Sequence, residues 1–317
     1  MPSTLQLVVN GLVFSSIVVL GSVGLSIVYS IAGFANFAHG DTMTVGAFAA
    51  LAAFGPLSGV GGELFGLPVG FFAALVVGMV VAALVAVATE LVVYRPLDVD
   101  SLSLLITSIG VAFVYRAVVQ LVFGTQFTSY GIDRSGPIPA VRETLGVAIT
   151  ERSVVIVASA AVLVVALHAL LQYTSLGRKM RAMADNPDLA RACGIYTGRV
   201  RIATWVVGAG LAGAGGVFLG LFSQLRPRMG FALLLVVFAA VILGGIGSVY
   251  GAMVGGAVIG MVHELVPLLP ALGAALPLVP DGVGLPVGSK YAPALAFLVM
   301  VAILLFRPEG IAGEARA

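Results

Sequence analysis

The chain has 317 residues, of which 60% are hydrophobic and only 9% are charged, and its mean hydropathy is +1.13. Soluble globular domains carry about 25% charged residues, so this composition excludes a soluble domain and predicts an integral membrane protein. The net charge of +2 gives no sign of a nucleic-acid partner, and a single cysteine excludes an internal disulfide. The three histidines have no Cys or Glu at ligand spacing, which argues against a metal site. No Lys or Arg precedes Arg95, so we expect no cleavable secretory signal.

Apolar runs along the chain predict the membrane spans. A transmembrane helix needs about 20 mostly apolar residues, because the hydrocarbon core is about 30 Å thick. Nine candidate spans follow in chain order: Leu5–Ile31, Thr42–Phe54, Phe65–Val93, Ser101–Phe123, Ser153–Tyr173, Ile202–Phe222, Phe231–Gly245, Ala252–Pro267 and Tyr291–Phe306. The second, seventh and eighth are short, so they would be tilted, extended into their flanks or re-entrant. The expected fold is a single transmembrane domain, residues 1–317, all-α and polytopic, with about eight to ten helices and re-entrant or broken segments among them.

Basic residues predict the orientation of the chain. The loop 174–201 carries six basic and two acidic residues, whereas the loop 124–152 carries three of each. The six basic residues are Arg178, Lys179, Arg181, Arg191, Arg199 and Arg201. Placing this loop in the cytoplasm puts nine basic residues inside and six outside, as the positive-inside rule favours. The N-terminus would then lie outside and the C-terminus inside; Arg226 and Arg228, in a short outer loop, count against this orientation.

The basic loop has a pattern of its own. Asp185-Asn186-Pro187 places a capping side chain before a proline at the first helical position, and Gly194 suits the left-handed residue that ends a helix, so a short helix is expected over Pro187–Cys193. Before it, three apolar residues share one helical face: Leu176, Met180 and Met183. Two interpretations remain open, a docking surface for a partner and a basic loop that fixes topology and binds anionic lipid.

The chain carries no motif for catalysis. A phosphate-binding Walker loop needs Gly-Lys followed by Ser or Thr, and neither Lys179 nor Lys290 follows a glycine. A Gly-x-Ser-x-Gly elbow between a strand and a helix is also missing. We therefore expect a transport component rather than an enzyme, without a cofactor of its own. If ATP supplies the energy, another chain must bind it.

The turn Asn36–Asp41 is the best candidate for a polar site at membrane depth. Polar groups there are costly and usually face the bundle interior or a water-filled path. Asp41 is expected to cap a helix that begins at Thr42. The turn is then either an ordinary capped turn, in which His39 donates to a backbone carbonyl, or a lining of the inner translocation path by Asn36 and His39.

Two glycine bands, at 208–220 and 244–260, predict close helix packing, with a contact face made by Gly251, Gly255 and Gly256. The alternative is that the run Gly244-Gly245-Ile246-Gly247-Ser248 breaks a helix and exposes backbone carbonyls to the path.

Three charged residues lie within or near the ends of spans. Arg116 lies seven residues from the end of its span, a depth of about 10 Å, so we expect it to snorkel to the outer interface rather than contact a substrate. Glu90 and Glu264 lie near span ends and are expected to cap or pair.

Several runs of residues resemble one family. The loop Leu176–Ala182 with Asn186–Ile195, the turn Asn36–Asp41 followed by Val45-Gly46-Ala47, the run Val241–Ser248 and the ending Leu305–Gly310 are similar to the membrane permeases of branched-chain amino acid ABC transporters. The resemblance covers most of the chain, although the stretch 267–285 is longer than the family's usual link to the last helix.

The resemblance implies an inner-membrane permease subunit of an ABC importer. Its partners would be a second, similar permease, two ATPase subunits that bind ATP and Mg²⁺, an extracytoplasmic binding protein and the lipid bilayer. The substrate would be branched-chain amino acids first, with other amino acids, urea and short amides left open. The ATPase-coupling residues would be Gly177, Arg178, Arg181, Ala182, Asp185, Asn186, Pro187, Ala190, Arg191 and Gly194. The candidate path residues are Asn36, His39, Asp41, Gly244, Gly245, Gly247 and Ser248.

A rival interpretation is an ion-coupled secondary transporter or a channel. It needs an acidic coupling site or a selectivity ring, and no carboxylate falls in the middle of a well-defined span. A structural membrane scaffold is a third interpretation.

Overall fold

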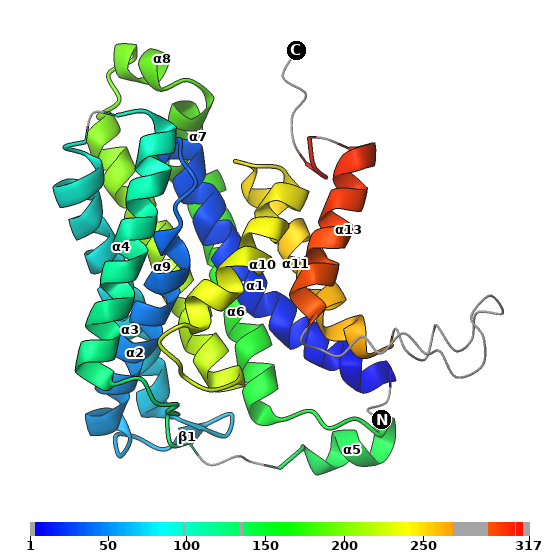
Figure 1. Ribbon diagram of the computed structural model, residues 1–317. Coiled ribbons are helices and arrows are strands. Elements are labelled where there is room, and N and C mark those ends of the chain that lie inside the picture. Colours follow the sequence, from blue (N-terminus) through cyan, green and yellow to red (C-terminus); the bar gives the residue numbers. More distant parts are fainter. Residues whose placement is uncertain (1–3, 98, 133–135, 269–290, 308, 313–317) are drawn as a thin grey trace.

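The computed structural model describes residues 4–97, 99–132, 136–268, 291–307 and 309–312, and this part of the chain is almost wholly helical (Figure 1). The long helices are α1 (Thr4–Ala32), α2 (Ala38–Leu57), α3 (Val69–Thr89), α4 (Ser101–Phe123), α6 (Glu151–Tyr173), α9 (Thr197–Phe222), α10 (Met229–Gly244), α11 (Val249–Leu265) and α13 (Ala292–Phe306). The short elements are β1 (Glu63–Leu64), β2 (Leu67–Pro68), the π-helix η1 (Glu90–Tyr94), α5 (Pro139–Leu145), α7 (Ser175–Asp185), α8 (Pro187–Ala192) and the 3-10 helix η2 (Val266–Leu268).

Each of the nine predicted apolar segments overlaps with one of the long helices. Among the described residues, six helices are long and apolar enough to cross a bilayer, namely α1, α3 with η1, α4, α6, α9 and α11 with η2, while α10 and α13 are shorter apolar helices. The second predicted span is extended in both directions, from Thr42–Phe54 to the 20 residues of α2. The all-α polytopic fold is therefore confirmed. The long stretch at 267–285 lies, apart from its first two residues, outside the described residues.

Successive long helices alternate in direction (Figure 1). One end of the bundle carries α7, α8 and the last turn of α13, and the other carries the β1–β2 hairpin, α5 and the start of α1. This arrangement puts the basic loop and the end of α13 at the same end, opposite the start of α1, as the charge distribution predicted. Which end faces the cytoplasm remains a prediction.

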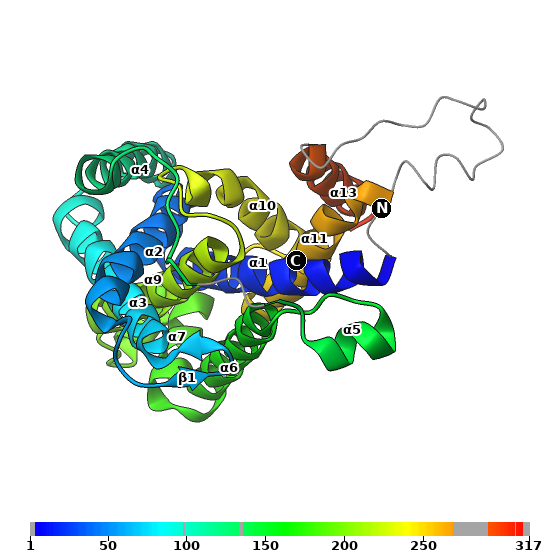
Figure 2. The ribbon, with the colours of Figure 1, turned by 90° about the horizontal axis from the view of Figure 1, so that it is seen from below.

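Helices α1 and α9 form the centre of the bundle, and α4 and α6 lie at its edge. Most of the apolar window of α1 and of α9 is buried, whereas only about a quarter of that of α4 and α6 is buried. Figure 2 shows α1 crossing the bundle beneath α10 and beside α11. Close packing of backbones holds the centre together: a Cβ on Gly208 would lie 2.7 Å from the carbonyl oxygen of Gly24.

The predicted glycine contact face is confirmed. A Cβ on Gly251 would collide with the backbone of Gly244, and one on Gly255 with the carbonyl of Ala240, both in α10. A Cβ on Gly256 would lie 2.9 Å from the Cα of Val19 in α1. In lipid, where there is little hydrophobic drive between helices, such approach lets packing hold α11 against both neighbours.

The third predicted span began too early. Residues Glu63–Leu64 and Leu67–Pro68 pair as an antiparallel hairpin, and α3 begins at Val69. Phe65 lies in the hairpin turn with φ of 52° and is exposed. Its apolar side chain suggested a helix, but Gly66, also at positive φ, and Pro68 favour a turn followed by a helix start.

Candidate functional site

The side chain that bonds to the backbone at the start of α2 is Asn36 rather than Asp41, and the residue just before the helix is Phe37. The chain leaves α1 at Ala32 and is non-helical through Phe37. Asn36 Oδ1 accepts hydrogen bonds from the Ala38 backbone N–H at 3.0 Å and from the Tyr94 hydroxyl at 3.3 Å. Because α2 starts at Ala38, Asp41 lies in its first turn, and the prediction that Asp41 caps a helix starting at Thr42 is wrong.

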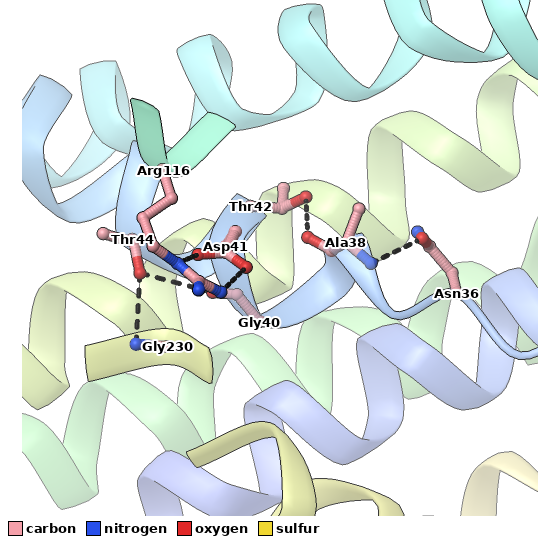
Figure 3. A network of polar contacts seen from close by, with 8 residues as sticks. All are labelled: Asn36, Ala38, Gly40, Asp41, Thr42, Thr44, Arg116 and Gly230. Carbon is pink, nitrogen blue, oxygen red and sulfur yellow. Dashed lines mark hydrogen bonds and ion pairs between the residues drawn. The ribbon is translucent and has the colours of Figure 1, made fainter. Parts of the chain in front are cut away.

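Asp41 instead forms a buried ion pair with Arg116 of α4 (Figure 3). Arg116 Nε donates to Asp41 Oδ1 at 3.2 Å and Nη2 donates to Oδ2 at 2.9 Å, the two-pronged geometry in which guanidinium and carboxylate match best. The side chain of Asp41 is 1% exposed and that of Arg116 is 11% exposed. The prediction that Arg116 snorkels to the outer interface is wrong, because an opposite charge at the same depth is a nearer partner than the water.

The ion pair lies where α2, α4 and α10 meet. The Arg116 guanidinium stacks over the ring of Phe231, the third residue of α10, at 4.5 Å, and lies 5.3 Å from the ring of Phe113. Beside the pair, Thr44 Oγ1 accepts from the Gly230 N–H at 3.1 Å and donates to the Gly40 carbonyl at 3.4 Å (Figure 3). Gly40 and Gly230 let the first turns of α2 and α10 touch, since a Cβ on Gly40 would lie 2.5 Å from the Gly230 carbonyl oxygen.

His39 is buried on the other side of the same turn. Its Nε2 donates to the Gly21 carbonyl of α1 at 2.9 Å, which is the hydrogen bond expected of the capped-turn interpretation. Asn36 and His39 are each 2% exposed. Their role in lining a path stays a prediction.

The run at 244–248 breaks the helix, as predicted, between α10 and α11. Gly245 and Gly247 have φ of 105° and 87°, which favour glycine. The carbonyls of Leu243 and Gly244 accept from the N–H groups of Ile311 and Ala312, at 2.9 and 3.0 Å. The Gly245 carbonyl accepts from the Ser248 N–H at 3.0 Å. Two carbonyls of the run, those of Gly244 and Gly245, therefore have backbone donors. A role of the run in lining a path stays a prediction.

The short helix in the basic loop is confirmed. Asn186 Oδ1 accepts from the N–H groups of Asp188 and Leu189, at 3.1 and 2.9 Å, and Pro187 opens α8. Gly194 has φ of 82° beyond the helix end. In α7, Met180 and Met183 are buried and Leu176 is half-buried, so the predicted apolar face packs inward.

Only part of the positive charge in the loop is free. Arg201 forms an ion pair with Glu90, and Arg181 donates to the Leu171 carbonyl and to Gln172 Oε1 at the end of α6. Four of the loop's basic side chains remain on the surface: Arg178, Lys179, Arg191 and Arg199. Arg191 has an exposed contact to Asp188 at 3.5 Å, and Arg199 lies over the ring of Tyr196. Of the predicted coupling residues, Gly177 and Ala190 are buried, Ala182 is half-buried and the rest are exposed.

The ion pair of Glu90 connects this loop to the turn before α2. Glu90 opens the π-helix η1 and is 1% exposed, and Arg201 comes from the second turn of α9. One turn further along α9, Trp205 stacks on Tyr94, with ring centroids 5.6 Å apart, and Tyr94 reaches Asn36. The predictions that Glu90 and Glu264 pair are confirmed, since Glu264 contacts His263 at 3.2 Å.

Known proteins with similar sequences decide the family. The family model described as branched-chain amino acid transport system / permease component matches residues 7–306. The chain is 31% identical over 315 residues to the high-affinity branched-chain amino acid transport system permease protein LivH of Salmonella typhimurium, covering 98% of this chain and 96% of the relative. The chain belongs to this family. It is also 31% identical over 313 residues to the corresponding permease protein BraD of Pseudomonas aeruginosa, with the same coverage.

The resemblance seen in the sequence is therefore confirmed, and the permease is a multi-pass protein of the cell membrane and the membrane subunit of an ABC importer. Among solved structures, PsaBC from Streptococcus pneumoniae in complex with Fab is 11% identical, covers 93% of the permease and 90% of that chain, and has a TM-score of 0.47. So distant a likeness carries no argument.

The residue that sequence reasoning missed in this permease is Arg116. One signal was present: an aspartate at the start of one span and an arginine inside another, both costly in lipid and of opposite sign. Nothing in the sequence showed that α2 and α4 bring the two residues together.

Proposed function

We propose that this permease forms, with a second and similar permease, the path by which branched-chain amino acids cross the membrane. The relatives LivH and BraD are named as permease proteins of high-affinity branched-chain amino acid transport systems, which supports this substrate class. ATP and Mg²⁺ bind to two separate ATPase subunits, and an extracytoplasmic binding protein delivers the substrate. Family membership supports this mechanism over an ion-coupled transporter, a channel or a scaffold.

The observation that carries the ATPase proposal is the surface formed by α7 and α8, which we call the coupling surface. It protrudes from one end of the bundle (Figure 1) and presents the 62% exposed Leu189 with three exposed basic side chains, Arg178, Lys179 and Arg191. The Asn186 cap stabilises the start of α8, and the bond from Arg181 joins α7 to the end of α6. An apolar tip with a polar rim is typical of a protein interface, and its proposed partner is an ATPase subunit.

Co-purification of the ATPase tests the coupling surface. The tagged permease is co-expressed with the second permease and the ATPases, and a Leu189→Glu variant should retain at least tenfold less ATPase. The control is Arg142→Glu on α5, an exposed residue at the opposite end of the bundle, which should retain the wild-type amount. Full retention by Leu189→Glu would contradict ATPase docking and favour the lipid-binding interpretation.

Uptake by proteoliposomes tests the substrate. The reconstituted complex, with binding protein outside and ATP inside, should accumulate radiolabelled leucine, and unlabelled isoleucine or valine should compete while urea should not. ATP hydrolysis without leucine uptake, or uptake of urea in its place, would contradict the proposed substrate.

A further inference from the structure

The ion pair of Asp41 and Arg116 has the chemical make-up of a site for an amino-acid head group. A zwitterionic amino acid carries one carboxylate and one ammonium, and this junction supplies one guanidinium and one carboxylate in contact. The rings of Phe113 and Phe231 lie against the guanidinium and offer apolar surface next to the charges. The three kinds of group match the carboxylate, the ammonium and the aliphatic side chain of one substrate.

The Arg116 side of the pair can be reached from the face formed by α4 and α10, because Arg116 is 11% exposed, whereas Asp41 is 1% exposed. Phe113 and Phe231 are exposed on this face. Within the described part of the chain, Arg116 Nη1 has no hydrogen-bond acceptor, and it is not fully buried. A guanidinium with a free donor at an accessible face can take up a second carboxylate without first losing the partner it has.

The backbone around the pair has the form expected beside a path rather than beside lipid. Helices α2 and α10 both begin inside the bundle, and their first turns meet at Gly40 and Gly230 next to the pair (Figure 3). Each is preceded by a non-helical segment, residues 33–37 and 223–228. Non-helical backbone at membrane depth is tolerated only where protein or water surrounds it. Helices that start inside the membrane also direct their positive N-terminal ends toward anionic substrate groups.

We propose that the pair of Asp41 and Arg116 is a transient site for the head group of a zwitterionic, apolar amino acid during transport. This inference rests on the proposed function. Arg116 binds the substrate carboxylate, Asp41 binds the ammonium, and Phe113 and Phe231 contact the side chain. The exchange converts one ion pair into two, so that no charge is left unpaired at depth. A free acid or an amine would leave one protein charge without a partner, which is costly there.

A double variant separates this role from that of a structural brace. Neutralising one residue of the pair leaves the other buried with an unpaired charge, whereas neutralising both leaves no buried charge that needs a partner. Asp41→Asn/Arg116→Gln should keep the melting temperature of the purified permease within about 3 °C of the wild-type value. It should lose leucine uptake at least tenfold in proteoliposomes. Thr44→Val is the control beside the pair, because it removes the bond to Gly230 and leaves both charges; its uptake should stay within twofold.

The outcomes distinguish this inference from the proposed function. Wild-type uptake by the double variant would overturn the head-group site and leave the proposed function intact, whereas no leucine uptake by the wild-type complex would overturn the proposed function itself. If the double variant fails to fold, Arg116→Lys serves instead. It keeps both charges and loses only the two-pronged hydrogen bonding of the guanidinium. Its uptake per folded permease should fall at least tenfold, and uptake within twofold of wild type would overturn the inference.

Ligand-induced stabilisation of the purified permease gives a second readout. Leucine at a concentration on the order of 10 mM should raise the melting temperature of the wild type but not of the double variant. The carboxylic acid without the amine, 4-methylpentanoate, and the amine without the carboxylate, isopentylamine, should leave it unchanged. An equal shift with either analogue, or none with leucine, would overturn the site.

Discussion

At the scale of single residues, the carboxylates of Asp41 and Glu90 are buried and each contacts one arginine from a distant part of the chain. Taking a charge out of water costs several kcal/mol unless a partner is present, so each pair restricts which helices can be neighbours. The first pair joins α2 to α4, and the second joins η1 to α9.

Removing Arg201 tests the second pair. Arg201→Ala leaves Glu90 buried without its partner and should destabilise the permease by about 2–3 kcal/mol, less than for a fully buried pair because water reaches Arg201. The melting temperature should fall by several degrees. Arg199→Ala is the matched control, since Arg199 is exposed and lies over the ring of Tyr196. An equal effect of the two variants would contradict the importance of the pair.

At Gly230, the addition of one methyl group should lower the stability of the permease. Its Cβ would collide with the Gly40 carbonyl and lie 2.6 Å from Thr44 Oγ1, so Gly230→Ala should destabilise by about 1–3 kcal/mol through overpacking. Gly110→Ala, on α4 with nothing within 4 Å, should be neutral or stabilise by up to about 1 kcal/mol through helix propensity. Melting temperatures of the two purified variants give the comparison, and a neutral Gly230→Ala would show that α2 and α10 separate easily.

At the scale of elements, α8 has only six residues, too few to be stable alone. Its N-terminus depends on Asn186, its proline fixes the first turn, and Ala190 packs inward. The helix therefore exists because caps and neighbours hold it, and its exposed tip is available to a partner.

Loss of the cap should loosen α8 alone. Asn186→Ala removes an acceptor for two backbone N–H groups and should cost about 1 kcal/mol, so the amides of α8 should exchange roughly fivefold faster with deuterium. Asn186→Asp keeps an acceptor and should protect them as the wild type does. Unchanged exchange in Asn186→Ala would mean that packing, rather than the cap, holds the helix.

At the scale of the whole molecule, the permease is a bundle with two distinct ends. The coupling surface and the close of α13 lie at one, and the hairpin and α5 lie at the other (Figure 1). The polar turn of Asn36 is linked to the coupling-surface end through Tyr94 and through Trp205 of α9.

Cys193, the single cysteine of the chain, tests the orientation. It is exposed at the end of α8. A membrane-impermeant thiol reagent should label the permease, expressed alone, in inside-out vesicles and not in right-side-out membranes. A variant with Cys193→Ser and Ser58→Cys, whose new thiol follows α2 at the other end, should show the reverse. Labelling of Cys193 from outside would invert the predicted topology.

The pattern along the chain was sufficient for most of the fold, because the need to satisfy the backbone in lipid makes each long apolar run a helix. The span starts at Phe65 and Thr42 were wrong. Phe65 lies in a turn at positive φ, and Asp41, the predicted cap, lies inside α2 and pairs with Arg116. The caps of α8 were predictable because they involve only residues next to one another.

The sequence by itself determined the class, the family and the short helix α8, since composition, motifs and caps are local properties. Only the tertiary structure decided which charges meet. Asp41 and Arg116 are 75 residues apart in the sequence, and Glu90 and Arg201 are 111 residues apart. Local patterns do not reach over such separations. The contacts of these residues depend on how α2, α4, α9 and η1 pack. Glycines permit this packing, but no run of neighbouring residues encodes it. The candidate head-group site therefore emerged from the bundle, while the coupling surface was already visible in the chain.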